Sequence, residues 1–131
     1  MVTVLHAPAS AGEVRRHIGA DLASAGVPAA VVGDVALIAS ELVGNAVRYA
    51  RPLAGGVLEV SWSVGPDCVR LQVTDGGGPS VPHRHDAGPA DVRGRGLAIV
   101  TALASAWGVE TGGNGAGPAS TVWVEIPVRP T

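Results

Sequence analysis

Residues 29–50 carry apolar side chains at helical spacing that cover more than half of a helix circumference. Pro28 suits the first turn of such a helix, and Arg51-Pro52 stops it near Ala50. So wide an apolar face must be buried against other elements, which makes this helix the centre of the predicted core. The apolar positions are Val31, Val35, Ile38, Leu42, Ala46 and Tyr49, widened by Val32, Ala39, Val43 and Val47.

The flanking segments predict one more helix before it and a hairpin after it. Residues 2–6 alternate weakly, as in a short edge strand, and Ser10-Ala-Gly-Glu13 has the spacing of a capping box opening a helix to about Ala25. Two segments with apolar residues at every second position are joined by the turn at 65–67 and predict a β-hairpin. Their inward-facing residues are expected to be Leu58, Val60, Trp62 and Val64, followed by Val69, Leu71 and Val73.

The remaining chain predicts a loop, a third helix and a last strand. Residues 75–93 are expected to form a mobile loop, and the helix is expected from about Gly94 to Trp107-Gly108. After a glycine-rich turn, the strand runs from Ser120 to Val128. The order of helices and strands predicts an α+β two-layer sandwich on a mixed, mainly antiparallel sheet, formed by residues 1–131 as one domain. The chain has no Phe, so the three tryptophans (Trp62, Trp107 and Trp123) are expected in the core.

Composition excludes several classes of site. All nine basic residues are arginine, so neither a Walker A loop nor a Schiff-base lysine is present. A net charge of -2 argues against a nucleic-acid duplex as the main partner. Cys68 is the single cysteine, which excludes intramolecular disulfides and zinc knuckles. No secretory signal is recognisable, and no apolar run approaches the ~18 residues of a membrane span, so a cytoplasmic protein is expected.

The central helix also carries a narrow polar sector, formed by Asp34, Glu41, Asn45 and Arg48. Glu41 and Asn45 are i, i+4 neighbours, so their side chains point the same way from one edge of the buried face. A carboxylate and an amide carbonyl beside an apolar wall can hold a hard cation or orient a hydroxyl group. The same pattern also fits the solvated edge of an amphipathic helix.

Two glycine clusters follow. Asp75 is followed by three glycines and Pro79, an arrangement that lets backbone approach a ligand closely but that also occurs in ordinary turns. The second cluster, at 93–97, opens the third helix, where free N–H groups suit a phosphate. It lacks the third glycine of the dinucleotide-binding fingerprint.

In combination these pieces resemble the gyrase/chaperone/histidine-kinase/mismatch-repair (GHKL) ATPase superfamily. Glu41-Leu-Val-Gly-Asn45-Ala-Val-Arg48 resembles its N box, Asp75-Gly-Gly77 its G1 box and Gly94-Arg-Gly96-Leu97 its G2 box. The similarity is greatest to bacterial anti-sigma-factor serine/threonine kinases, especially short stand-alone actinobacterial members, and extends to Trp107-Gly108 and Thr121-Val-Trp123. It implies the left-handed, Bergerat-type ATP-binding sandwich, with the nucleotide between the helices.

The resemblance also implies roles for individual residues. Asn45 would hold the Mg²⁺ that bridges the ATP phosphates, Glu41 would act as general base or orient the attacking hydroxyl, and Arg48 would lie near phosphate. Asp75 would accept a hydrogen bond from the adenine amine. Gly77 would let the base lie flush, and Thr121 would support the adenine pocket beside Asp75. The lid over the phosphates would contain Arg93, Gly94, Arg95, Gly96 and Leu97.

The implied activity is phosphorylation of an antagonist protein on serine or threonine by Mg-ATP. The implied partners are a sigma factor and its anti-anti-sigma antagonist, with no direct contact to nucleic acid or membrane, and the resemblance also allows a homodimer. Two departures favour an alternative: Pro79 stands where the family has glycine, and the lid has no lysine. The alternative is a catalytically weak or inactive nucleotide-sensing module that switches its affinity for a partner.

Overall fold

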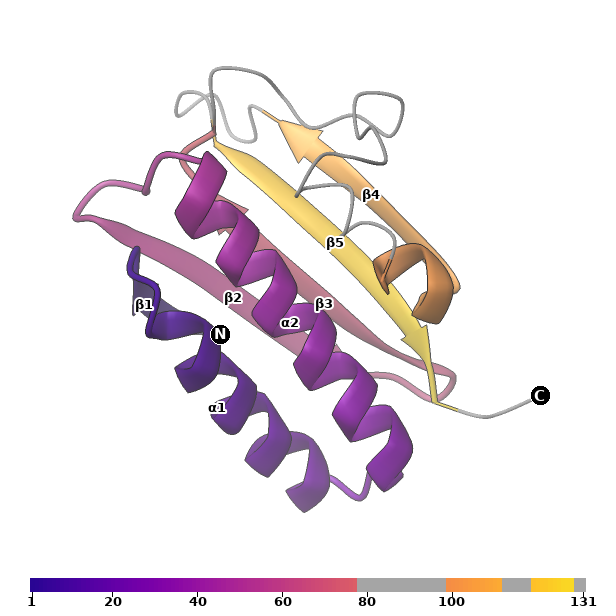
Figure 1. Ribbon diagram of the computed structural model, residues 1–131. Helices are drawn as coiled ribbons and strands as arrows, with labels where there is room; N and C mark the ends of the chain where they lie inside the picture. The colour runs from indigo at the N-terminus through magenta and orange to yellow at the C-terminus, as the bar shows by residue number, and fades with distance from the viewer. Residues whose placement is uncertain (78–98, 112–118, 129–131) are drawn as a thin grey trace.

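Two helices lie on one face of an antiparallel sheet in the computed structural model, which describes residues 1–77, 99–111 and 119–128 (Figure 1). The helices are α1 (Ser10–Ser24) and α2 (Ala29–Tyr49). The strands are β1 (Val2–Leu5), β2 (Val57–Val64), β3 (Cys68–Asp75), β4 (Ala106–Thr111) and β5 (Ser120–Pro127). Residues 99–103 are helical as well. The predicted α+β two-layer sandwich is confirmed.

The strands of the described part pair in the order β1-β2-β3-β5-β4, and every neighbouring pair is antiparallel. The edge strand expected at residues 2–6 and the hairpin of β2 and β3 are therefore confirmed. In β3 the side chains of Val69, Leu71 and Val73 are buried, as their spacing predicts. The last residue of β3, Asp75, lies opposite the first residue of β5, Ser120.

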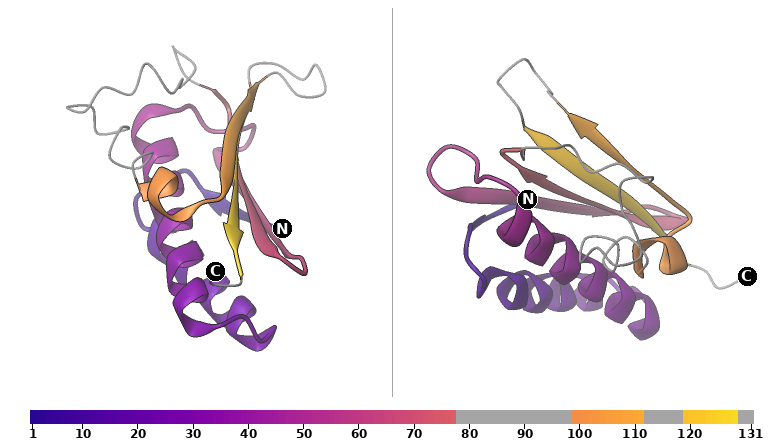
Figure 2. Two further views of the ribbon diagram at one scale, coloured as in Figure 1. Left: turned by 90° about the vertical axis from the view of Figure 1, so that its right-hand side faces the viewer. Right: turned by 45° about the horizontal axis from the view of Figure 1, so that its top comes forward.

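The helix α2 packs across β3 and β5 and against α1, while α1 also contacts β1. Figure 2 shows both helices on the same side of the sheet. The predicted apolar stripe of α2 is confirmed, because Val35, Ile38 and Val43 are fully buried. By length and composition alone this 21-residue helix is also apolar enough to cross a membrane, contrary to the expectation from sequence. Its buried face accounts for much of that hydropathy.

The predicted capping box at the start of α1 is wrong. Ser10 is already the first helical residue, and its hydroxyl donates to the carbonyl oxygen of Leu5 at 2.7 Å. The N-cap position is held by Ala9, whose side chain makes no capping hydrogen bond. Ser10 is buried beside the end of β1. Its hydroxyl therefore bonds to a backbone carbonyl outside the helix, whereas the local pattern predicts a bond to the helix amides.

The third helix ends earlier than predicted, and Trp107 and Gly108 lie in β4 rather than at a helix end. Pairing with β5 starts at Ser105, whose amide donates to the carbonyl oxygen of Glu125 at 2.8 Å. Residues 78–98, which include most of the predicted loop and the start of this helix, lie outside the described residues.

Of the tryptophans, Trp62 and Trp107 are partly buried against the core, but Trp123 lies on the opposite face of the sheet. Its indole ring lies over Gly108, and the Arg70 guanidinium lies 4.7 Å from the ring centroid. The core placement of Trp123 is therefore wrong, because alternation in β5 turns its side chain away from buried Val124. Val64, at the end of β2, is 45% exposed and is not a core residue either.

We expect Gly108→Ala to destabilise the protein by about 1–3 kcal/mol through overpacking. A Cβ at this position would lie 2.8 Å from the Trp123 Nε1 atom and 2.9 Å from two ring carbons. Urea unfolding measures the change. Gly33→Ala in α2 is the matched control, since a Cβ there meets no atom within 4 Å, and it should leave stability unchanged or raise it. Equal stability of the two variants would contradict the packing of Trp123 on Gly108.

Candidate functional site

The polar sector of α2 lies at the edge of its buried face. Leu42, Val43 and Ala46 are buried and hold this part of the helix against the core. Glu41 and Asn45 are partly exposed. Asn45 is contacted by Arg48, one turn further along, whose Nη2 atom donates to the Asn45 Oδ1 atom at 3.0 Å. The amide oxygen therefore faces a cationic group on the exposed side of the helix.

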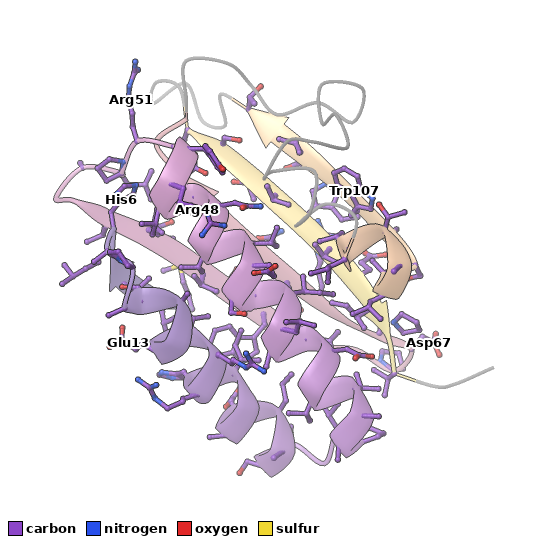
Figure 3. All side chains as sticks on the ribbon, viewed as in Figure 1. His6, Glu13, Arg48, Arg51, Asp67 and Trp107 are labelled. Carbon is purple, nitrogen blue, oxygen red and sulfur yellow. The ribbon has the colours of Figure 1, made fainter. Side chains whose placement is uncertain are left out.

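Glu41 and Arg48 also border a groove of about 500 Å³ between α1 and α2. From α1 the groove is lined by Gly12 and Arg15, among others. Figure 3 shows Arg48 on the side of α2 that faces away from the sheet. Neither Asn45 nor Asp75 is among the residues that line this groove.

A second polar group is buried where β3 ends. The side chain of Asp75 is 9% exposed, and its Oδ1 atom accepts a hydrogen bond from the Gly77 amide at 2.7 Å. Ser120, its cross-strand partner, is 5% exposed. Partners directly opposite in an antiparallel sheet share a face, so the carboxylate and this hydroxyl lie together on the helix side.

A backbone strap joins the two polar regions. The amide of Arg51 donates to the Gly77 carbonyl at 2.7 Å, and the amide of Gly76 donates to the Arg51 carbonyl at 2.7 Å. The end of α2, the end of β3 and the start of β5 thus lie at one end of the molecule (Figure 1). The last turns of α2, which carry Asn45 and Arg48, and the carboxylate of Asp75 belong to this same end.

The strap requires glycine at two positions. A Cβ at residue 76 would overlap the carbonyl oxygen of Pro52 and lie 3.0 Å from that of Arg51. Gly77 has a φ of 86°, in the left-handed region where side chains are strained. The sequence pattern assigns a role to Gly77 but none to Gly76, whose requirement depends on the backbone of Arg51 and Pro52, 25 and 24 residues earlier in the chain.

Thr121 does not lie beside Asp75 on the helix side. It is paired with Thr74, and the two hydroxyl oxygens are 2.8 Å apart on the opposite face of the sheet. This corrects the expectation that Thr121 supports a pocket next to Asp75, because alternation along β5 gives that position to Ser120. The alternation of Val122, Val124 and Ile126 is the signal for this choice, since Ser120 shares their face and Thr121 does not.

Five of the predicted site residues (Arg93, Gly94, Arg95, Gly96 and Leu97) lie outside the described residues, and so does Pro79. Among the residues that are described, no group of three or more His, Cys, Asp or Glu side chains could hold a metal ion. Mg²⁺ in nucleotide sites is bound by one or two protein oxygens together with substrate phosphates. The Asn45 amide oxygen fits that kind of site.

Comparison with known proteins gives a consistent result. A family model described as "Histidine kinase-like ATPase domain" matches residues 4–117. No curated protein matches the sequence. Among solved structures, a mycobacterial sensor histidine kinase, MprB, is similar with a TM-score of 0.50 and 18% sequence identity; the match covers 79% of this chain and 76% of that chain. At this level of identity the likeness is one of fold.

We expect Gly76→Ala to break the strap, because the added methyl group overlaps the Pro52 carbonyl. The free energy of unfolding should fall by about 1–3 kcal/mol, as for other overpacked sites. Urea unfolding checks this, with Gly19→Ala in α1 as the control, since a Cβ at residue 19 meets nothing within 4 Å. A Gly76→Ala protein as stable as the control would show that the strap is not formed as described.

Proposed function

This chain belongs to the histidine kinase-like ATPase family, and we propose that it is an anti-sigma-factor kinase that phosphorylates a serine or threonine of an antagonist protein with Mg-ATP. The family membership supports an ATP-binding, kinase-like role. The observation that carries the proposal is the strap, which brings the Asn45 end of α2 to the buried carboxylate of Asp75. An extended ligand with an amine at one end and a metal-bound anion at the other would have a partner at each end of this arrangement.

At the adenine end, the buried Asp75 carboxylate accepts a hydrogen bond from the exocyclic amine of the base. The Gly77 amide helps to fix its position by donating to the Oδ1 atom at 2.7 Å. Gly77 has no side chain to obstruct a flat ring. Ser120 adds a buried hydroxyl on the same face of the sheet.

At the phosphate end, the Asn45 Oδ1 atom would hold Mg²⁺. When bound, the ion would supply charge neutralisation at the phosphate oxygens, which together with positioning accounts for most of the catalysis of phosphoryl transfer. Arg48 already lies against Asn45, and its remaining N–H groups are available to donate to phosphate oxygens.

Glu41 lies one turn before Asn45 and is partly exposed. Its carboxylate accepts the proton of the attacking hydroxyl group, or orients that group toward the terminal phosphate. It borders the groove between α1 and α2, which a segment of protein substrate can approach from solvent. The sigma factor and the anti-anti-sigma antagonist are proposed as partners from the resemblance of the N, G1 and G2 boxes.

A second candidate function is a nucleotide-sensing module that binds ATP and changes its affinity for a partner without phosphoryl transfer. Pro79 in the G1 segment and the absence of lysine from the whole chain favour it. The two candidates share the nucleotide site and differ only in turnover.

We expect Glu41→Gln to lower phosphoryl transfer to an antagonist by about a hundredfold or more while leaving ATP affinity unchanged. Radiolabelled Mg-ATP and a panel of candidate antagonists measure transfer. Asp34→Asn, in the same polar sector two turns earlier, is the matched control and should retain wild-type activity. Tight ATP binding without transfer by the wild-type protein would favour the sensing module over the kinase.

We expect Asp75→Asn to weaken adenine-nucleotide binding by about 1.5–3 kcal/mol, the value of a hydrogen bond to a charged group. Calorimetric titration with ATP measures it. Thr121→Val is the control, because this side chain lies on the opposite face of the sheet and should leave the affinity unchanged. Unchanged ATP affinity of the Asp75→Asn variant would show that adenine does not bind at this end of the site.

A further inference from the structure

His6 follows β1 directly and reaches the last turn of α2. Its Nε2 atom lies 2.8 Å from the Ala50 carbonyl oxygen and 3.1 Å from the Ala46 carbonyl oxygen. Both partners are acceptors, so Nε2 carries the proton and donates to the two oxygens. Its backbone amide donates to the Gly56 carbonyl at 2.9 Å. Figure 3 shows the ring beside the end of α2, close to Arg51.

The end of α2 has no glycine cap to satisfy its carbonyl groups. The C-cap residue, Ala50, has extended backbone with φ -117° and ψ 161°, and the chain continues into Arg51-Pro52. The last carbonyl groups of a helix have no partners within the helix and need donors from elsewhere. The His6 side chain, 44 residues earlier in the chain, supplies such a donor to the Ala50 carbonyl. The Ala46 carbonyl also accepts the Ala50 amide at 3.0 Å, so His6 is its second donor.

The two carbonyl groups that accept from His6 lie at the two ends of the segment that connects Asn45 to the strap. Ala46 comes directly after Asn45, and Ala50 comes directly before Arg51, which forms the strap to Gly76 and Gly77. A shift of the last turn of α2 would therefore move Asn45 relative to the strap and to Asp75. The backbone of His6 is held where β1 ends, and its Nε2 atom is held by the helix carbonyl groups.

We propose that His6 is a positioning residue for nucleotide binding: it fixes the last turn of α2 and so sets the placement of the Asn45 amide relative to the Asp75 carboxylate. This inference rests on the proposed nucleotide-binding function. Misplacement matters most for a ligand that engages both ends at once, because a shift of about 1 Å in a catalytic or binding group has large effects. We therefore expect His6 to affect mainly the increase in ATP affinity that Mg²⁺ provides.

The test compares the dissociation constant of ATP with Mg²⁺ and in EDTA, by calorimetry, for the wild type and His6→Phe. Phenylalanine keeps a ring but has no donor. We expect the gain in affinity from Mg²⁺ to fall about tenfold while binding in EDTA stays unchanged. His6→Gln, which restores a donor, should recover most of the gain. The matched control is His17→Phe, since His17 is exposed on α1 against Trp62.

If the role of His6 is purely structural, the variant will be less stable, and ATP binding with Mg²⁺ and in EDTA will either weaken equally or stay unchanged. Each of these two binding results overturns the proposal. If His6→Phe does not fold, His6→Asn is compared with His6→Gln. The shorter amide should lose Mg²⁺-dependent affinity that the longer one keeps, and equal values for the two would overturn the proposal. A wild-type protein that binds no ATP removes the proposed function itself, which is a separate outcome.

Discussion

The reciprocal hydrogen bonds of Arg51 with Gly76 and Gly77 determine how the parts of this domain come together. They attach the segment after α2 to the segment after β3, so a helix and a strand that belong to different layers end at the same place. Both distances are 2.7 Å, and the approach is close enough that residue 76 has no room for a side chain. Without this pairing, packing of α2 on the sheet would still bury its apolar face, but it would not fix the Asn45 amide relative to the Asp75 carboxylate.

The parts of the fold that follow from local periodicity were predictable. The apolar stripe of α2 and the alternation in β3 identify buried residues, because burial of those faces is the main driving force and its period is set by backbone geometry. The start of α1 was not predictable in this way, since the Ser10 hydroxyl bonds to Leu5 instead of the helix amides. Trp107 and Gly108 were placed at a helix end because the strand that pairs with them, β5, comes later in the chain.

The candidate site shows the same division between local and distant information. The residue types at 41–48 and at Asp75 predict a nucleotide site, and the family match supports an ATP-binding class. The alternation of Val122, Val124 and Ile126 along β5 places Ser120, and not Thr121, on the buried face. That Ser120 lies opposite Asp75 depends on the pairing of β5 with β3, which comes from segments far apart in the chain. Gly76 was missed for a related reason, because the atoms that exclude a side chain there belong to Arg51 and Pro52.

The face of the sheet that the described helices leave uncovered carries side chains that pair laterally from strand to strand. These pairs are Arg70 with Glu125 at 2.9 Å, Thr74 with Thr121 at 2.8 Å and Ser61 with Gln72 at 3.4 Å. On the same face the Trp123 ring lies against Gly108, and the Arg70 guanidinium lies 4.7 Å from the ring centroid. Such mutual pairing satisfies polar groups and shields the aromatic ring without a third layer. Among the described residues, this face therefore offers water hydrogen-bonding groups in place of a contiguous apolar patch, which is the kind of surface that discourages association between sheets.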